Sequence, residues 1–318
     1  MAAVLLGSAA MAFSAGDDFA WQLPRGFPRP PVPADNPMTA AKVALGARLF
    51  ADTRLSVTGG YSCQSCHSPG RAFTDGLTVS RGALGDAVPL NAPTLLNAAY
   101  SASLGWKDPA IVTLEQQMRG PLFNEHPPEL GLRGQEAAVE GRLSADAQMV
   151  RDFATAFPGE PRAVSMDNVI RAIAAYERTL FAGASPFDHY VFGGEHGALD
   201  QSQKRGMQLF FSERSGCSAC HSGINFAGPW ADAGQPTATP VFADTGTGQK
   251  VRVPTLRNLA STAPFMHDGR FATLDAVLDH YERLATRPDA DPRLRRAPLT
   301  TGERADLHSF LDALNDAR

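Results

Sequence analysis

The pattern Cys-x-x-Cys-His occurs twice in this chain of 318 residues, at positions 63–67 and 217–221, and the two copies use every cysteine that the chain contains. Two thiols at this spacing can each form a thioether with one porphyrin, and the adjoining histidine can then bind the iron. A lone Cys-x-x-Cys motif also suits zinc or thiol redox chemistry, but the histidine that follows both copies argues against these alternatives. The sequence therefore predicts two covalently bound c-type haems, held by Cys63, Cys66, His67, Cys217, Cys220 and His221.

The composition limits the fold class and the kinds of partner. The chain has 29 basic and 33 acidic residues and a formal charge of −4, which offers no broad basic surface for nucleic acid. Glycine and proline are plentiful, at 29 and 24 residues, while alternating strand-like runs are scarce. We therefore expect a mostly α-helical fold with long ordered loops, in which haem supplies much of the core.

The first fifteen residues are small and apolar, and Ala10–Ala12 resembles a signal-peptidase site. We interpret residues 1–15 as a signal peptide, with a disordered tail as the alternative. No other segment has the ~18 uncharged apolar residues that span a bilayer. Because c-type haem is normally attached outside the cytoplasm, we expect a periplasmic protein with no membrane span in the mature chain.

Segments on either side of the two cysteine motifs repeat each other. Short amphipathic helices are predicted at 44–50 and 205–211, before each motif. The sequences Ala-Pro-Thr-Leu-Leu-Asn at 92–97 and Val-Pro-Thr-Leu-Arg-Asn at 253–258 follow the motifs. This repetition predicts two homologous c-type cytochrome domains, each holding one covalent haem. We assign them to residues 20–182 and 183–318, with the Gly-, His- and Asp-rich stretch 182–203 as the linker.

Further helices are indicated by local patterns. Thr113–Gln116 and Thr300–Glu303 both fit the capping box that begins a helix. Apolar residues between Asp167 and Phe181 recur on one stripe, as in a helix packed on one face.

The chain resembles the bacterial dihaem cytochrome c peroxidase family, including its MauG-like enzymes. The resemblance rests on both haem motifs and on the segments 91–97, 252–258 and 263–271. The resemblance extends from about residue 37 to the C-terminus. It implies that the N-terminal haem reacts with hydrogen peroxide and that the C-terminal haem stores and relays an electron. The tryptophan that lies between the haems of the family corresponds to Trp106, which the internal repeat matches with His267. A relay role is favoured for Trp106 over simple filling of volume.

The resemblance also implies a calcium ion between the domains and a polar pocket on the distal side of the first haem. The calcium positions correspond to Asn91, Thr262 and Pro264, where oxygen ligands are plausible, although an ordinary loop would have the same sequence. The distal-pocket and relay positions correspond to Gln117, Pro121, Glu129 and Trp106.

Glu129 is expected to act as general acid–base during cleavage of the peroxide O–O bond. The segment 124–129 is slightly longer than the family pattern, so Glu125 is a second candidate. Glu129 is preferred because Leu130-Gly131 follows it, as an apolar residue and glycine follow the family glutamate. A solvated carboxylate at Glu129 and a satisfied polar side chain at Gln117 are the structural alternatives.

Two positions depart from the ordinary peroxidases. No histidine lies between His67 and His126, so the first haem is expected to lack the removable sixth ligand and to be open without prior reduction. His126 is expected to be a loop residue. The methionine that binds the second iron in those enzymes corresponds to Tyr281, the MauG-like choice.

Helical spacing supports Tyr281 as an inward residue. It shares one apolar stripe with Leu274 and Leu278, whereas His280 points roughly 100° away. An anionic phenolate stabilises oxidised iron. The alternatives are a hydrogen-bonded core tyrosine, or Met266 or His267 as the ligand, with Met266 expected in the core.

The resemblance therefore implies an oxidoreductase that uses hydrogen peroxide to oxidise Trp or Tyr side chains of a periplasmic partner protein. In MauG-like enzymes the electrons move over a long range, through a state in which both haems share the oxidising equivalents as Fe(IV). Two kinds of MauG-like enzyme are equally good models: one matures a tryptophan-derived quinone, and the other oxidises a tryptophan on a copper-binding partner. The alternatives are a dihaem cytochrome c peroxidase with a small cytochrome or copper protein as donor, and a passive electron carrier.

Overall fold

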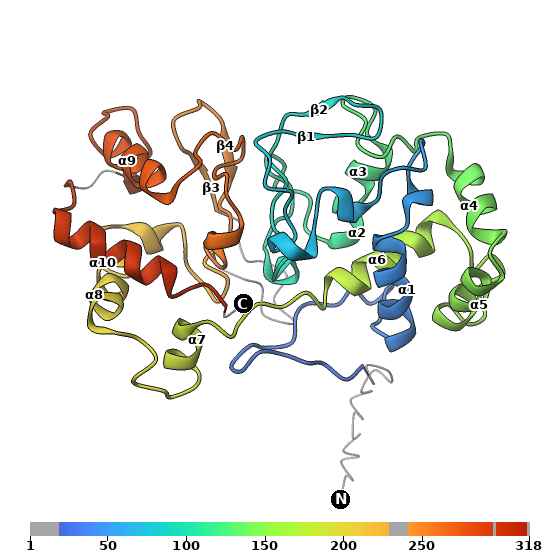
Figure 1. Cartoon of the computed structure of the whole chain (residues 1–318), viewed down its shortest axis with the longest axis horizontal. Coiled ribbons are helices and arrows are strands. Elements are labelled where there is room, and N and C mark those ends of the chain that lie inside the picture. Colours follow the sequence, from blue (N-terminus) through green and yellow to red (C-terminus); the bar gives the residue numbers. More distant parts are fainter. Residues whose placement is uncertain (1–18, 229–240, 295–296, 317–318) are drawn as a thin grey trace, which may run out of the picture.

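The computed structural model describes residues 19–228, 241–294 and 297–316. The predicted signal peptide therefore lies outside the described residues. The chain forms two halves that lie side by side, with the elements between residues 40 and 177 on the right of Figure 1 and those between residues 186 and 312 on the left. Helices and loops dominate both halves, which confirms the mostly α-helical prediction. Within the described ranges, none of the helices has the length and apolar character required to cross a bilayer.

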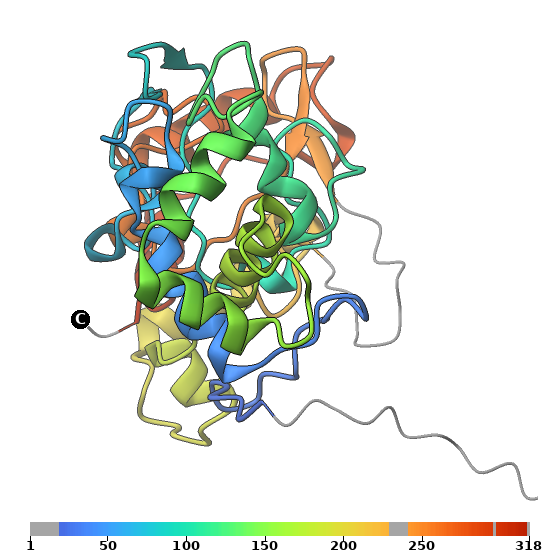
Figure 2. The same cartoon turned by 90° about the vertical axis from the view of Figure 1, so that its right-hand side faces the viewer.

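The N-terminal half is built from helices around one small hairpin. Helices α4 and α5 cover its outer end, as Figure 2 shows. The helices are α1 (Ala40–Phe50), α2 (Leu114–Gln117), α3 (Arg119–Phe123), α4 (Glu136–Ser144), α5 (Ala147–Ala156) and α6 (Met166–Glu177). The strands β1 (Ser80–Arg81) and β2 (Ala87–Val88) pair antiparallel, and the 3₁₀ turns are η1 (Thr53–Leu55), η2 (Cys63–Ser65), η3 (Pro69–Arg71) and η4 (Ala98–Tyr100).

The C-terminal half has the same general plan. Its hairpin lies near the middle of the molecule, on the side that faces the other half (Figure 1). The helices are α7 (Pro186–Val191), α8 (Gln201–Phe210), α9 (Leu274–Ala285) and α10 (Thr301–Asp312). The strands β3 (Phe242–Asp244) and β4 (Lys250–Arg252) pair antiparallel, and the 3₁₀ turns are η5 (Cys217–Ala219), η6 (Leu259–Ser261) and η7 (Pro292–Leu294).

In each half, the helix that precedes the cysteine motif packs on the last long helix of that half, α1 on α6 and α8 on α10. A glycine makes each contact close: a Cβ on Gly46 would overlap the Ala172 carbonyl oxygen, and one on Gly206 would overlap that of Asp306. Each pair supports its own apolar core, formed between residues 45 and 180 in one half and between residues 187 and 314 in the other. The two motifs therefore start from equivalent scaffolds.

The repeat in the sequence is also a repeat of backbone geometry. Asn97 and Asn258 both adopt the left-handed conformation, with φ of 58° and 59°. Thr94 donates its hydroxyl proton to the Ala72 carbonyl at 2.6 Å, and Thr255 donates to that of Asn225 at 2.7 Å. The threonines of the Ala-Pro-Thr and Val-Pro-Thr segments thus hydrogen-bond to the loop that follows each cysteine motif in the same way.

The local helix signals are confirmed. Both predicted capping boxes are present, at the start of α2 and of α10. The apolar stripe of the 167–181 segment forms the buried face of α6, with Val169, Ile170 and Ile173 in the core.

The stretch 182–203 is not a plain linker, because it contains α7 and the first residues of α8. Phe187 packs in the core of the C-terminal half. Asp188 accepts two hydrogen bonds from the buried guanidinium of Arg257, at 2.8 and 2.9 Å. The composition predicted a linker, and the buried pair of Asp188 and Arg257 makes part of this stretch an element of the core.

Candidate functional site

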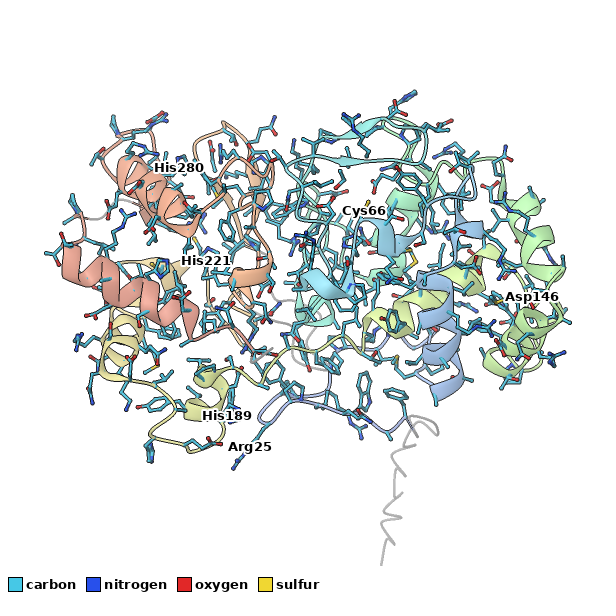
Figure 3. The ribbon with its side chains drawn as sticks, in the orientation of Figure 1. Arg25, Cys66, Asp146, His189, His221 and His280 are labelled. Carbon is cyan, nitrogen blue, oxygen red and sulfur yellow. The ribbon has the colours of Figure 1, made fainter. Side chains whose placement is uncertain are left out.

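The first cysteine motif lies in the wall of a cavity of about 390 Å³ that residues of both halves line, hereafter the first cavity. The motif folds as a tight turn in which the His67 N–H donates to the Cys63 carbonyl at 2.9 Å. This turn brings Cys63, Cys66 and His67 to the cavity wall, and Figure 3 labels Cys66 in the N-terminal half. His67 Nδ1 lies 2.9 Å from the Phe73 carbonyl oxygen, so Nδ1 carries the proton and Nε2 keeps a lone pair for a metal.

The second motif repeats this arrangement around a cavity of about 150 Å³, the second cavity. The His221 N–H donates to the Cys217 carbonyl at 2.9 Å, and His221 Nδ1 lies 3.0 Å from the Phe226 carbonyl oxygen. Cys217 and Cys220 line the second cavity, and His221 lines both cavities. Figure 3 labels His221 in the C-terminal half. Each histidine is therefore oriented by a carbonyl group, as metal-binding histidines commonly are.

The residues around each motif fit a covalently attached haem better than zinc or thiol chemistry. Burial lowers the pKa of His67 and of His221, which favours the neutral imidazole that a metal requires. Burial also raises the pKa of the Cys66 thiol to about 11, so it is not an activated thiolate. Among the described residues, no cluster of three or more His, Cys, Asp or Glu side chains could hold a metal ion.

The polar residues expected on the distal side all reach the first cavity. Gln117 ends α2, Pro121 lies in α3, and Glu129 follows in the next loop; all three line the cavity. Burial raises the pKa of the Glu129 carboxyl, which favours its protonated form. Glu125 is exposed and pairs with Arg133 at 3.2 Å, outside the cavity walls. The structure thus brings Glu129, not Glu125, to the cavity.

Glu177, at the end of α6, is a further carboxyl in the wall of the first cavity, and it is not among the residues that the sequence motifs identify. The side chain is buried, and its Oε2 has no hydrogen-bond partner within the described chain. Burial is the main cause that raises its pKa to about 8. The next residue, Arg178, pairs with Glu115 at 2.9 Å instead. Glu177 lies seven residues after Ile170 and so continues the apolar stripe of α6. This helical spacing is the sequence signal that could have revealed Glu177 as a buried residue.

We expect Glu177→Gln to remove a pH dependence of stability. The carboxyl releases its proton near pH 4.5 in the unfolded chain but near pH 8 in the folded protein. The folded state therefore binds more protons between these values, and the parent loses up to about 5 kcal/mol of stability as the pH rises through this range. Urea unfolding at pH 5 and pH 9 should show the variant more stable than the parent only at pH 9. The exposed Glu125→Gln is the control, and equal pH slopes for Glu177→Gln and the parent would contradict the prediction.

Trp106 lies in the wall that the two cavities share, since it lines both. Its indole Nε1 donates to the Asn91 carbonyl at 3.0 Å, and its ring centre is 6.3 Å from that of His267. The main-chain N–H of Arg252 donates to the Trp106 carbonyl at 2.9 Å. Segments from both halves therefore hold the indole between the two cysteine motifs.

The positions expected to hold calcium lie in the wall of the first cavity. Asn91, Thr262 and Pro264 all line the first cavity. Because the Asn91 carbonyl accepts from Trp106, we expect its side-chain Oδ1 to be the atom that faces a cation. Calcium binding stays a prediction.

Helix α9 presents Tyr281 to the cavities. Tyr281 lines both cavities, as His221 does, and burial together with the nearby Cys220 raises the pKa of its hydroxyl. His280 is directed elsewhere, with Nε2 2.8 Å from the Thr245 carbonyl oxygen. Met266, expected in the core, instead lines both cavities with a φ of 74°. Met266, which the sequence analysis gives as an alternative ligand, is thus a thioether within the same walls.

Comparisons with known proteins agree on one family. The sequence model of the di-haem cytochrome c peroxidase family matches residues 40–196. The chain is 36% identical to the methylamine utilization protein MauG of Methylorubrum extorquens, over 89% of this chain and 81% of that protein. It is 37% identical to a cytochrome c551 peroxidase of Pseudomonas aeruginosa, over 76% of this chain and 72% of the relative.

Solved structures give the same result. A MauG-like protein associated with microbial copper homeostasis superimposes with a TM-score of 0.86 at 38% identity, covering 94% of this chain and 96% of that one. The diheme peroxidase BthA of Burkholderia thailandensis has a TM-score of 0.70 at 26% identity, covering 88% and 87%.

Proposed function

Because the chain belongs to the di-haem cytochrome c peroxidase family, whose members are peroxidase-type oxidoreductases, we propose that it is a MauG-like enzyme. Its reaction is the oxidation by hydrogen peroxide of Trp or Tyr side chains on a partner protein. Haem, when bound at the two motifs, supplies iron that accepts oxidising equivalents from peroxide. The protein positions the haems, controls access and moves protons and electrons.

The observation that carries this proposal is Tyr281 in the walls of the second motif's cavity, together with His221. We propose that His67 and His221 would each bind the iron of one haem, and that Tyr281 would be a further ligand of the C-terminal haem. Burial raises the pKa of Tyr281 despite the opposing charge of Arg270, and a bound metal ion would instead favour the phenolate. A hard anionic ligand then favours the oxidised iron and lowers its potential relative to a thioether.

In the first cavity, we propose that Glu129 exchanges a proton with the two peroxide oxygens. Its burial keeps a proton available, and Gln117 offers an amide that can orient the peroxide by hydrogen bonding. Pro121 adds an apolar surface without a main-chain donor. His126 is exposed and outside the cavity walls, so no histidine between His67 and Glu129 competes for this face.

We propose that Trp106 carries electrons between the two haem sites and that a calcium ion at Asn91, Thr262 and Pro264 stabilises the wall of the first cavity, where the Asn91 carbonyl accepts from Trp106. The partner is proposed to be a periplasmic protein. The similarity to a MauG-like protein associated with copper homeostasis favours a partner that binds copper. The periplasmic location follows from covalent haem attachment, which takes place outside the cytoplasm.

One experiment separates the three candidate functions. Hydrogen peroxide is added to the purified, oxidised protein, first alone and then with a reduced small cytochrome. A MauG-like enzyme should give a long-lived spectral change of both haems without prior reduction. A cytochrome c peroxidase should instead turn over the reduced cytochrome, and an electron carrier should change little. Rapid turnover of cytochrome without the long-lived change would overturn the proposal.

We expect the two motifs to bind haem independently. Cys63→Ala with Cys66→Ala should lower the intact mass by one haem, as should Cys217→Ala with Cys220→Ala. His67→Gln should keep the mass and change the visible spectrum, because the thioethers retain the porphyrin. Mass spectrometry and absorption spectra of the purified variants test this, and a parent protein with a single haem would contradict it.

A further inference from the structure

Arg252 brings a guanidinium group into the wall between the two cavities. It is the last residue of β4 and lines both cavities. Its guanidinium carbon lies 5.0 Å from the centre of the Trp106 ring, in a cation–π arrangement. Its main-chain N–H donates to the Trp106 carbonyl. One residue therefore holds Trp106 through both its backbone and its charge.

The charge of Arg252 has no anionic partner in the part of the chain that the structure describes. Its Nε is buried and makes no hydrogen bond there. Other arginines in similar surroundings are paired: Arg257 with Asp188 at 2.8 Å, and Arg293, in the second cavity wall, with Asp291 at 2.7 Å. Removal from water lowers the pKa of Arg252 to about 10. A guanidinium held this way is costly unless an anion meets it.

The neighbouring residues point to the kind of anion. His267, which also packs against Trp106, has a buried Nδ1 without a partner within the described ranges, so two unpaired nitrogen atoms lie near the same indole. Glu282 lines the second cavity with a buried Oε1 that has no partner in the described ranges, but no ion pair joins it to Arg252, and its Oε2 lies 3.6 Å from Arg304. A carboxylate from a group inside a cavity would suit Arg252 best, because a guanidinium can bind both carboxylate oxygens. Haem carries two propionate carboxylates.

We propose that Arg252 binds a propionate carboxylate of a covalently attached haem and so fixes Trp106 between the two motifs. Arg252 is thus a positioning residue for Trp106. The inference depends on the two predicted haems, but not on which substrate the enzyme oxidises. The guanidinium also offsets the negative charge of the propionate near the iron. Without the guanidinium, the negative charge of the propionate favours the ferric state. The reduction potential of the haem that carries this propionate therefore falls.

The test is a spectroelectrochemical titration of the holoprotein with Arg252→Gln and Arg252→Lys. Thioether attachment keeps the haem in both variants, and the two haems are followed separately by their different absorption spectra. Arg252→Gln should lower the equilibrium constant for reduction of one haem at least tenfold, which is about 59 mV for a one-electron couple. Arg252→Lys keeps the charge and should retain most of the parent potential. The haem that shifts identifies which propionate is bound.

Two further variants serve as controls for the effect of the Arg252 charge on the haem potential. Arg293→Gln removes a cation that Asp291 already pairs in the second cavity wall, so both potentials should stay close to the parent values. Arg252→His provides a charge that pH can switch if Arg252→Gln does not fold. Its haem potential should fall as the imidazole loses its proton between about pH 5 and 8, more steeply than in Arg252→Lys.

Gln and His variants whose potentials follow the parent at every pH would overturn the role of Arg252. These are equilibrium measurements without peroxide or partner. Failure of partner oxidation would therefore contradict the proposed function but would not affect the proposed role of Arg252.

Discussion

Tyr281→Phe should abolish peroxide-dependent oxidation of the partner while both haems stay attached. The ring fills the same space in the cavity walls, so the fold and haem content should match the parent. Loss of the hydroxyl removes the anionic ligand, and oxidising equivalents should then stay at the first haem and be lost to solvent or to self-damage. We expect partner modification to fall by roughly 100-fold or more, since loss of even the hydrogen-bond partners of metal ligands costs about 10–100-fold. Mass spectrometry of the partner measures this.

The controls use the other residues near Tyr281. His280→Gln changes a side chain that hydrogen-bonds the Thr245 carbonyl and should leave partner oxidation intact. Met266→Leu removes the thioether that lines both cavities and should leave the ferric spectrum of the second haem unchanged. Tyr281→Met should raise the potential of the second haem and shift the enzyme toward cytochrome turnover. If Tyr281→Phe keeps the parent spectrum while Met266→Leu changes it, the ligand is Met266, and the cytochrome c peroxidase function becomes the better one.

Local signals in the sequence predicted those parts of the fold that depend on neighbouring residues. The two capping boxes, the buried stripe of α6 and the helices before each motif all arise from contacts within a few residues. The internal repeat extended this to the loops, because Asn97 and Asn258 occupy the same left-handed turn. A repeated sequence motif that requires a particular turn therefore predicts the backbone geometry at both of its positions.

Features that depend on distant segments were not predictable in this way. Helix α7 in the stretch 182–203 starts with a local capping box between Ser185 and Asp188, but its place in the core depends on Arg257, which pairs with Asp188 from far along the chain. Arg252 begins the segment 252–258 that carries the family resemblance, but only the structure shows that its guanidinium lacks an anionic partner among the described residues where β4 meets Trp106. Met266, expected in the core, lines both cavities from a loop position with a positive φ, which the local pattern does not indicate. Whether a charged side chain such as that of Arg252 is paired or buried depends on segments that come together only in the folded protein.

Trp106→Phe should slow partner oxidation by about tenfold or more, which corresponds to about 1.4 kcal/mol of activation free energy. Phenylalanine preserves an aromatic ring beside His267 and beneath Arg252 but is far harder to oxidise than an indole. An electron would then have to cross the shared wall in one longer step. The initial reaction with peroxide should be unchanged, because the distal residues Gln117 and Glu129 belong to separate elements. Stopped-flow spectra of the two haems, recorded with and without partner, separate the steps.

The matched control is Trp21→Phe, since Trp21 packs between Phe19 and Phe181, outside both cavities. It should leave both the haem reaction and partner oxidation at the parent rate. Loss of the indole N–H in Trp106→Phe also removes the hydrogen bond to the Asn91 carbonyl, so calcium content must be measured in the same sample. Slow transfer with normal calcium content assigns the defect to the missing indole. An unchanged transfer rate would mean that the wall conducts electrons equally well without the indole, and would reduce Trp106 to a packing role.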